Sequence, residues 1–288
     1  MYLMKSILVP IDFSQCSKNA LKAAIQIAET TGAVIELVHI YDRPVIGFVD
    51  LNIDHIKHKK LQNKMDLSMK DLIAENSTAD VVLNSTILYD ISLPEIFELP
   101  KFNNIDMVVM GSQGASGLKE LFIGSNTEKV VRRAKCPVLC LKENQDIFSF
   151  NKVVLASNFY KELELIFPQI DSFLKVFGPT YHLLKVNTPN NFETTRYSRR
   201  IMDAFADKFK LDNYAVHVYN DNHVESGILN FSKEINADAI IIATHGRRGL
   251  EHFINGSLAE DVVNHAVTPV LSFRLKGLDK NENVLFPE

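Results

Sequence analysis

Apolar residues along the chain alternate between two patterns, one typical of buried strands and the other of amphipathic helices. Residues 6–11 (SILVPI) form a continuous apolar run, as expected for a strand that is buried on both faces of a sheet. Residues 14–32 then place apolar side chains at helical spacing and end in Gly32, a common helix terminator. Strands separated by helices predict an α/β protein with a parallel sheet and right-handed crossovers.

The same alternation continues to the end of the chain. In the first half, further strands are predicted at 34–41, 80–89, 105–110 and 136–142, and further helices at 54–75, 93–102 and 125–134. In the second half, strands are predicted at 152–157, 181–186, 214–219, 239–244 and 269–275. Ligands of such sheets bind beyond the carboxyl ends of the strands, where the strand order reverses. Asp12 and Gly111, which follow the first and fourth strands, should therefore lie on that edge.

The chain contains an internal repeat. The segment GSQGASGLKELFIGSNTE at 111–128 resembles ATHGRRGLEHFINGSLAE at 243–260, and aligning Gly114 with Gly246 shifts the chain by 132 residues. The starts of the two units match at a shift of 146 residues, so the second unit is about 14 residues shorter before its motif. The repeat predicts two doubly wound domains of five parallel strands each, over residues 1–145 and 150–277, followed by a C-terminal tail at 278–288.

Composition restricts the class of protein without identifying its function. The 288 residues are 46% hydrophobic and 23% charged, and the net charge of -4 gives no general attraction to nucleic acid or anionic lipid. No stretch approaches the roughly 18 apolar residues of a membrane span, and the three cysteines form no CxxC pair. We therefore expect a cytoplasmic protein that has no disulfide framework and does not bind nucleic acid or membranes. His55 and His58 lie on a lysine-rich predicted helix, which we interpret as a solvated face and not as a metal site.

Glycines and a serine after the predicted fourth strand indicate an anion site. Gly111 and Gly114 let the backbone turn and approach a ligand without a Cβ, and Gly124 does the same before the helix that starts near Ser125. The first N–H groups of that helix have no intrahelical partner, and its dipole favours negative charge. A phosphate group there could accept several backbone hydrogen bonds and one from the Ser125 hydroxyl.

Helix capping is a competing explanation for part of this motif. Ser125 and Glu128 form a capping box, and Ser257 and Glu260 repeat it in the second unit. Capping accounts for the Gly-Ser pair but not for the two glycines that follow the fourth strand. The chain has no Gly-Lys-Ser/Thr loop and no G-x-G-x-x-G fingerprint, and no paired carboxylates flank the glycines. We therefore assign no catalytic residue and no metal ligand.

These features resemble the universal stress protein family in its tandem two-domain form, over nearly the whole chain. The resemblance rests on VPIDFS at 9–14, the segment at 111–142, and THGRRGLEHFINGS at 244–257 with the PVL that follows it. The family motif G-x2-G-x9-G-S/T is met in full by Gly111, Gly114, Gly124 and Ser125. The resemblance implies Rossmann-like domains whose last strands, 136–142 and 269–275, pair across a pseudo-twofold axis within one chain.

The resemblance also implies that the first unit binds an adenine nucleotide, ATP or AMP, either alone or together with Mg2+. By position, the adenosine is contacted by Pro10, Ile11, Asp12, Ile40 and Met110. The ribose and phosphates are contacted by Gly111, Gln113, Gly114, Gly124, Ser125 and Asn126. Gln113 departs from the histidine common in the family but can still form hydrogen bonds. Asp12 could instead serve the start of the helix that follows it.

The second unit departs further from the family pattern. Ala156 replaces Pro10, and Ala243 replaces Gly111, where it adds a methyl group at a position for which we expect a positive φ. The residues of this weaker second site are Asn158, His245, Gly246, Gly256 and Ser257. Asn158 stands in the place of Asp12 and carries no charge. We expect nucleotide to bind mainly in the first unit.

Three functions remain open from the sequence. The first is a regulatory protein of a stress response that binds ATP or AMP and changes its conformation or partner binding with occupancy. The second is a structural or interaction protein of the same fold whose loops serve only helix capping. The third is a slow ATPase. The partners that follow are the nucleotide and the other domain of the chain, and a homodimer is left open.

Overall fold

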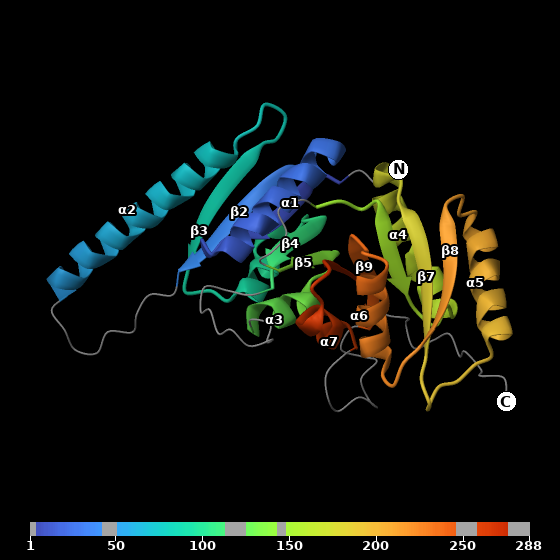
Figure 1. The fold of residues 1–288 in the computed structure, drawn as a ribbon. Coiled ribbons are helices and arrows are strands. Elements are labelled where there is room, and N and C mark those ends of the chain that lie inside the picture. The colour runs from blue at the N-terminus through green and yellow to red at the C-terminus, as the bar shows by residue number, and fades with distance from the viewer. Residues whose placement is uncertain (1–3, 42–50, 113–124, 143–147, 246–257, 276–288) are drawn as a thin grey trace.

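A single ten-stranded sheet runs through the molecule (Figure 1). The computed structural model describes residues 4–41, 51–112, 125–142, 148–245 and 258–275, without the side chains of residues 51–58, Ser125, Thr244, His245 and Leu275. We refer to β1–β5 with their helices as the N-terminal unit, and to β6–β10 with theirs as the C-terminal unit.

The N-terminal unit follows the predicted alternation of strand and helix. Its strands are β1 (Ser6–Pro10), β2 (Val34–Tyr41), β3 (Leu83–Tyr89), β4 (Met107–Gly111) and β5 (Val138–Leu141). Its helices are α1 (Gln15–Thr31), α2 (Leu51–Asn76), the 3-10 helices η1 (Leu93–Glu98) and η2 (Pro100–Phe102), and α3 (Ser125–Arg133).

The C-terminal unit repeats this order. Its strands are β6 (Lys152–Ala156), β7 (Thr180–Asn187), β8 (Tyr214–Asn220), β9 (Ala239–His245) and β10 (Val270–Leu275). Its helices are α4 (Lys161–Leu174), the 3-10 helix η3 (Lys175–Phe177), α5 (Thr195–Phe209), α6 (Val224–Glu234) and α7 (Leu258–His265).

The strand order confirms the predicted fold class. The sheet runs β3-β2-β1-β4-β5-β10-β9-β6-β7-β8. Every strand pairing in the described sheet is parallel except that of β5 with β10. Within each unit the order reverses beside the first strand, between β1 and β4 and between β6 and β9. These are the two points at which a doubly wound sheet binds ligands.

The antiparallel pairing of β5 and β10 joins the two units. Cys140 lies opposite Val270 and Val138 opposite Ser272, and the Ser272 hydroxyl donates to the Val138 carbonyl at 3.3 Å. The expected pairing of the last strands within one chain is confirmed. Because β5 would otherwise be an unpaired sheet edge, this contact satisfies backbone groups on both units.

Two hydrophobic cores, one on each face of the sheet, extend across both units. One face is covered by α1, α2, α4 and α5, and the other by η1, α3, α6 and α7. Phe173 of α4 and Phe273 of β10 lie in the first core, whereas Val131 of α3 and Val263 of α7 lie in the second. The continuous apolar runs of the strands follow from this burial on both faces.

Helix α1 shows how local sequence signals set the ends of an element. The Ser14 side chain accepts a hydrogen bond from the Ser17 N–H at its start. Gly32 ends the helix with a left-handed φ of 73°, and its N–H donates to the Ala28 carbonyl. Between them, an alanine-rich face is buried against the sheet. The predicted end of this helix at Gly32 is confirmed.

Two prolines in helical segments have different effects. The helix predicted at 93–102 is divided into η1 and η2, because Pro100 holds Leu99 in an extended conformation (φ -77°, ψ 133°). Pro168 lies inside α4, yet the helix is continuous from Lys161 to Leu174. The proline therefore does not split the first helix of the C-terminal unit.

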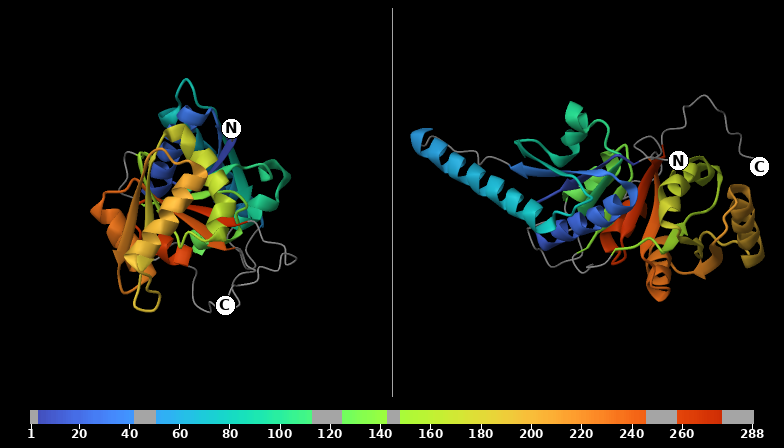
Figure 2. Two further views of the ribbon diagram at one scale, coloured as in Figure 1. Left: turned by 90° about the vertical axis from the view of Figure 1, so that its right-hand side faces the viewer. Right: turned by 90° about the horizontal axis from the view of Figure 1, so that it is seen from above.

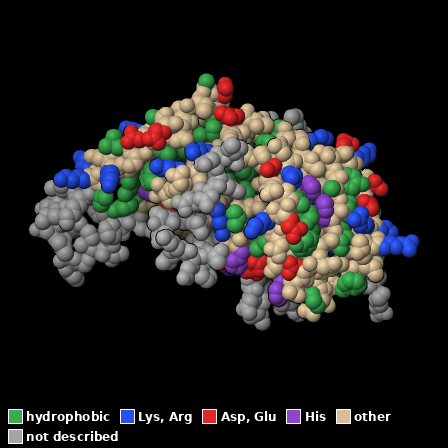
Figure 3. Space-filling view, in the orientation of Figure 1, with side chains coloured by type: hydrophobic (Ala, Val, Ile, Leu, Met, Phe, Trp, Pro, Cys, Tyr) green, Lys and Arg blue, Asp and Glu red, His purple; other side chains and the backbone are tan. Residues whose placement is uncertain are grey.

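Helix α2 extends beyond the sheet that it covers. Seen from above, its C-terminal part lies along β3 while the remainder projects away from the body of the molecule (Figure 2). Among its described side chains, Met69 and Leu72 of the last turns lie in the core. Lys59, Lys60 and Lys64 are exposed, and basic side chains gather at this end of the face shown in Figure 3.

The cysteines are free thiols. Cys16 and Cys140 are buried, and Cys136 packs against the same core as Cys140. Burial raises the pKa of the Cys136 thiol to about 12 and also raises that of Cys140. Both side chains therefore behave as core residues.

Two histidines are stacked on the outer strands of the C-terminal unit. The rings of His182 on β7 and His217 on β8 lie 5.1 Å apart, and His182 Nδ1 lies 3.0 Å from His217 Nε2. Burial, followed by the charge of Lys152, lowers the pKa of His182. Burial lowers the pKa of His217 too, with further contributions from His182 and Arg199. The pair is therefore more stable when neutral.

We expect this pair to make the free energy of unfolding depend on pH. The unfolded histidines titrate near pH 6.5 and the folded ones lower, so the unfolded state binds more protons below about pH 6.5. The contribution of the pair to the free energy of unfolding should be fully present above that pH. It should be lost as the pH falls through the folded pKa values. Urea unfolding at pH 7.5 and 5.5 should show a smaller loss for His182→Gln/His217→Gln than for wild type. His223→Gln, at an exposed position of the same unit, is the control, and equal losses in all three proteins would contradict this expectation.

Candidate nucleotide site at the switch point

The carboxyl ends of β1, β2 and β4 meet at the switch point of the N-terminal unit. Pro10 pairs in register with Val38, and Leu8 lies opposite Val108. The Ile11 N–H extends the ladder by donating to the Val38 carbonyl at 2.8 Å. Residues that follow these strands, far apart in sequence, are therefore brought to one edge.

Three apolar predicted site residues lie on the same face of the sheet at this edge. Pro10, Ile40 and Met110 each occupy the strand position two residues beyond a member of the core that α3 covers. Met110 is 4% exposed, whereas Pro10 and Ile40 are only partly buried. The edge thus offers accessible apolar surface beside a buried methionine, which suits a flat ring.

Asp12 lies in the turn between β1 and α1. Its Oδ1 accepts from the Ser14 N–H at 3.0 Å and from the Ser14 hydroxyl at 2.5 Å. Phe13, between them, has a φ of 63° and packs on His39, whose Nδ1 lies 2.6 Å from the Ile11 carbonyl oxygen. Asp12 is exposed and orders the start of α1, so the alternative role of serving that helix has direct support.

Gly111 is required by packing, and the expected positive φ is wrong. Positive φ among the described glycines occurs at Gly32 and Gly178 and not at Gly111. A Cβ at position 111 would instead lie 2.7 Å from the Cys16 Sγ and 2.9 Å from the Cys16 carbonyl carbon. The first turn of α1 therefore packs directly on the end of β4.

We expect Gly111→Ala to lower the free energy of unfolding by about 1–3 kcal/mol, because the added methyl group overpacks this contact. Urea unfolding measures the change. Adding Cys16→Ala should restore only part of the loss, since the backbone of residue 16 remains too close. Full recovery in the double variant would show that the sulfur alone is responsible.

The first turn of α3 is fixed above the end of β4. Buried Thr127 donates from its hydroxyl to the Gly111 carbonyl at 3.3 Å. This contact places the N-terminus of α3, with Ser125 and Asn126, at the same edge as Gly111, and Asn126 is exposed. Gln113, Gly114 and Gly124 lie outside the described residues.

Ser112 is a candidate that the sequence analysis missed. Its side chain is buried, and its N–H donates to the Leu141 carbonyl at 2.8 Å. Its Oγ has no hydrogen-bond partner among the described residues. A buried hydroxyl without a partner is costly unless water or a ligand satisfies it. The only sequence signal was its place between two glycine-motif residues.

The corresponding edge of the C-terminal unit has the same backbone but different side chains. Phe159 has a φ of 60°, as Phe13 does, and Asn158 is exposed like Asp12. The turn is held differently, because the Ser157 hydroxyl accepts from the Phe159 N–H at 3.1 Å. His245 ends β9, whereas Gly246, Gly256 and Ser257 lie outside the described residues.

The apolar surface of this second edge is covered. Val186, which corresponds to Ile40, is 5% exposed, and Ala156 and Ile242 are also buried. Helix α6 packs closely here, because a Cβ on Gly227 would lie 2.5 Å from Val186 Cγ1. The shorter η1 takes the place of α6 in the N-terminal unit. The two edges thus differ in how much apolar surface a ligand could reach.

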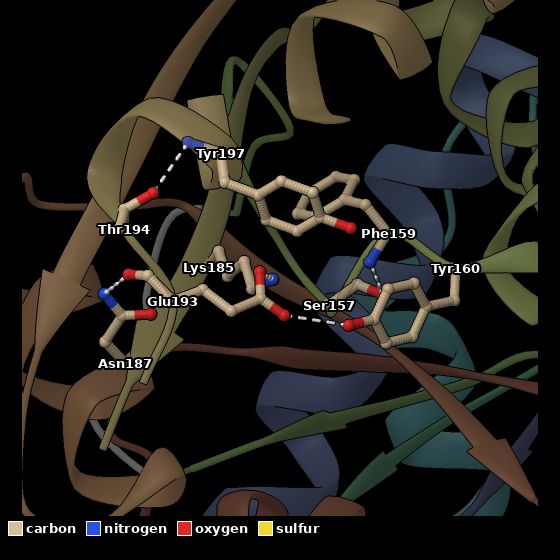
Figure 4. A network of polar contacts seen from close by, with 8 residues as sticks. All are labelled: Ser157, Phe159, Tyr160, Lys185, Asn187, Glu193, Thr194 and Tyr197. Carbon is tan, nitrogen blue, oxygen red and sulfur yellow. Dashed lines mark hydrogen bonds and ion pairs between the residues drawn. The ribbon is translucent and has the colours of Figure 1, made fainter. Parts of the chain in front are cut away.

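A buried ion pair occupies the other face of the second edge (Figure 4). Lys185, in the place of His39, is 1% exposed and pairs with Glu193, whose side chain is 20% exposed. Glu193 also accepts from the Tyr160 hydroxyl at 2.9 Å, and its backbone carbonyl accepts from Asn187 Nδ2 at 2.9 Å. The Lys185 ammonium lies 5.6 Å from the centre of the Tyr160 ring and 5.9 Å from that of Tyr197.

We expect the two halves of this ion pair to respond unequally to mutation. Glu193→Gln leaves a fully buried ammonium without its counter-charge and should cost about 3–5 kcal/mol of unfolding free energy. Lys185→Met leaves a carboxylate that water can reach and should cost clearly less. Urea unfolding compares both with Glu164→Gln, whose exposed partner Lys208 predicts a loss below about 1 kcal/mol. A larger loss for Lys185→Met than for Glu193→Gln would contradict the assignment.

The fold and this edge define a doubly wound α/β protein with a glycine-motif helix at its switch point. No group of three or more His, Cys, Asp or Glu that could hold a metal ion occurs among the described residues. Within the same residues, no helix combines the length and apolarity needed to cross a membrane.

The chain belongs to the universal stress protein family. The family model matches twice, at residues 4–142 and 181–274, so two such domains stand in tandem. The chain is 24% identical to the universal stress protein E homolog of Haemophilus influenzae, over 90% of this chain and 94% of the relative. A universal stress protein of Methanocaldococcus jannaschii is 29% identical over 49% of this chain and 84% of its own length.

A solved structure shows the same tandem fold. The crystal structure of a universal stress protein from Archaeoglobus fulgidus matches with a TM-score of 0.72 and 20% sequence identity. The match covers 96% of this chain and 100% of that chain. The overall fold of this chain is therefore shared with a known structure.

Proposed function

We propose that the chain binds an adenine nucleotide, ATP or AMP, at the switch point of its N-terminal unit and acts as a regulatory protein of a stress response. The adenosine contacts Pro10, Ile11, Asp12, Ile40 and Met110. The ribose and phosphates contact Gly111, Gln113, Gly114, Gly124, Ser125 and Asn126. The proposal follows the family resemblance and is supported by the geometry of the described residues.

The observation that carries the proposal is the difference between the two edges. Pro10 and Ile40 keep accessible apolar surface beside Met110, whereas Ala156, Val186 and Ile242 are all buried. Burial of a flat apolar ring is favourable in proportion to the apolar area that it covers. An adenine ring therefore gains more at the N-terminal edge, and we infer that nucleotide binds mainly there.

The first turn of α3 supplies the anion-binding part of the proposal. Its N–H groups lie above the end of β4, because Thr127 is bonded to the Gly111 carbonyl. Helix N-termini stabilise phosphate through these N–H groups and the helix dipole. The Ser112 hydroxyl at the same place, which has no partner within the described part of the chain, can donate to a ligand oxygen. The residues present thus fit a nucleotide, and we assign no group to its hydrolysis.

Equilibrium binding by calorimetry tests the proposal on the full chain freed of copurified nucleotide. We expect wild type to bind ATP and Asp12→Ala to bind it about tenfold more weakly, through loss of a charged hydrogen-bond acceptor. Asn158→Ala, the same change at the matching position of the C-terminal unit, should leave the affinity unchanged. Absence of wild-type binding at millimolar ATP would contradict the proposal and favour the structural or interaction role.

A further inference from the structure

Helices α3 and α7 meet beside the β5–β10 pairing, and one side chain joins their first turns. Arg132 donates from Nε to Glu260 Oε1 at 3.0 Å and from Nη2 to Glu260 Oε2 at 2.9 Å. The same Nη2 donates to Glu128 Oε1 at 2.9 Å. Glu128 and Glu260 hold equivalent positions in the two helices. The Arg132 guanidinium therefore forms hydrogen bonds with one carboxylate of each unit.

Two other contacts between the units resemble each other. Lys142 donates to the Asn264 carbonyl at 2.7 Å, and Arg274 donates to the Arg133 carbonyl at 3.2 Å. Each pair joins a basic residue after or on the last strand of one unit to the C-terminal end of the other unit's helix. Positive charge is favourable at that end of a helix. These two contacts have the same form in both directions.

The Arg132 bridge has no such counterpart. The residue of α7 that corresponds to Arg132 is Asn264, whose side chain carries no charge and cannot form an ion pair with Glu128. In this bridge the N-terminal unit supplies the cation, from α3, and the C-terminal unit supplies the carboxylate, from α7. Glu260 is 8% exposed, so its carboxylate is held at a fixed position.

Charge at the N-terminus of α3 depends on this bridge. Long side chains on a helix lean toward its N-terminus, and the contact with Glu128 places the guanidinium within the first turns of α3. Glu128, Glu260 and Arg132 together carry a net charge of about -1 when all are ionised. A phosphate tail at Ser125 and Asn126 would be repelled by both carboxylates and attracted by the guanidinium.

We propose that Arg132 is a positioning residue through which the C-terminal unit sets the nucleotide affinity of the N-terminal unit. Glu260 holds the guanidinium beside Glu128 and adds a negative charge from the neighbouring unit. The charge of Glu260 therefore offsets part of the attraction between the guanidinium and the nucleotide phosphates. This inference rests on the proposed function, and it assigns the regulation of that same site.

The direction in which two matched substitutions change the ATP affinity tests the proposal. Arg132→Gln and Glu260→Gln both break the bridge, but they change the charge near α3 in opposite directions. We expect ATP affinity, measured by calorimetry at low salt, to fall about fivefold in Arg132→Gln and to rise about threefold in Glu260→Gln. A purely structural bridge would instead weaken binding in both variants. Both shifts should be smaller for AMP, which carries less charge, and smaller at 500 mM salt.

Two controls separate this effect from damage to the fold. Arg133→Gln removes the same charge from the neighbouring residue of α3 and keeps the backbone contact with Arg274, so it should change ATP affinity less than Arg132→Gln does. Urea unfolding without nucleotide, for both single variants and the double variant, should show non-additive losses if the bridge forms in solution.

The outcomes distinguish the two proposals. Wild type that binds ATP, with affinity shifts in the same direction or no shift in the two bridge variants, would overturn the role of Arg132 and leave the proposed function in place. Equal shifts for AMP and ATP would overturn it as well. Wild type that does not bind ATP would overturn both the proposed function and this regulation.

Discussion

The structure depends on the antiparallel pairing of β5 with β10. Each unit alone would end in an exposed sheet edge flanked by apolar faces, and such edges readily pair with other chains. Pairing them converts two five-stranded sheets into one and lets both hydrophobic cores continue from one unit to the other. Because the two glycine-motif helices flank this pairing, it also fixes how the two candidate edges are related.

The sequence allowed most of the fold to be predicted, for identifiable physical reasons. Strands buried on both faces leave continuous apolar runs such as 6–11, and a repeat shows each element twice. Gly32 marked the end of α1 correctly. The division of the helix at 93–102 was missed, although Pro100 gave a local signal for it.

The position of the candidate site could be predicted, but the tertiary contacts that fix its residues could not. Gly111 was interpreted through backbone conformation, whereas the structure shows a contact with Cys16, and such contacts depend on packing between distant segments. A lysine in the strand at 181–186 gave no sign that Lys185 would be buried with Glu193. The covering of Val186 by α6 and the contact of Arg132 with Glu260 are likewise tertiary, so no local pattern encodes them.

Because both units belong to one chain, their interface does not depend on protein concentration. In a dimer of separate subunits, the equivalent of the β5–β10 pairing would weaken on dilution, because assembly depends on protein concentration. Here the second partner is always present at the effective concentration set by the chain that connects them. The interface, and any signal that Arg132 passes through it, is therefore insensitive to how much of the protein a cell makes.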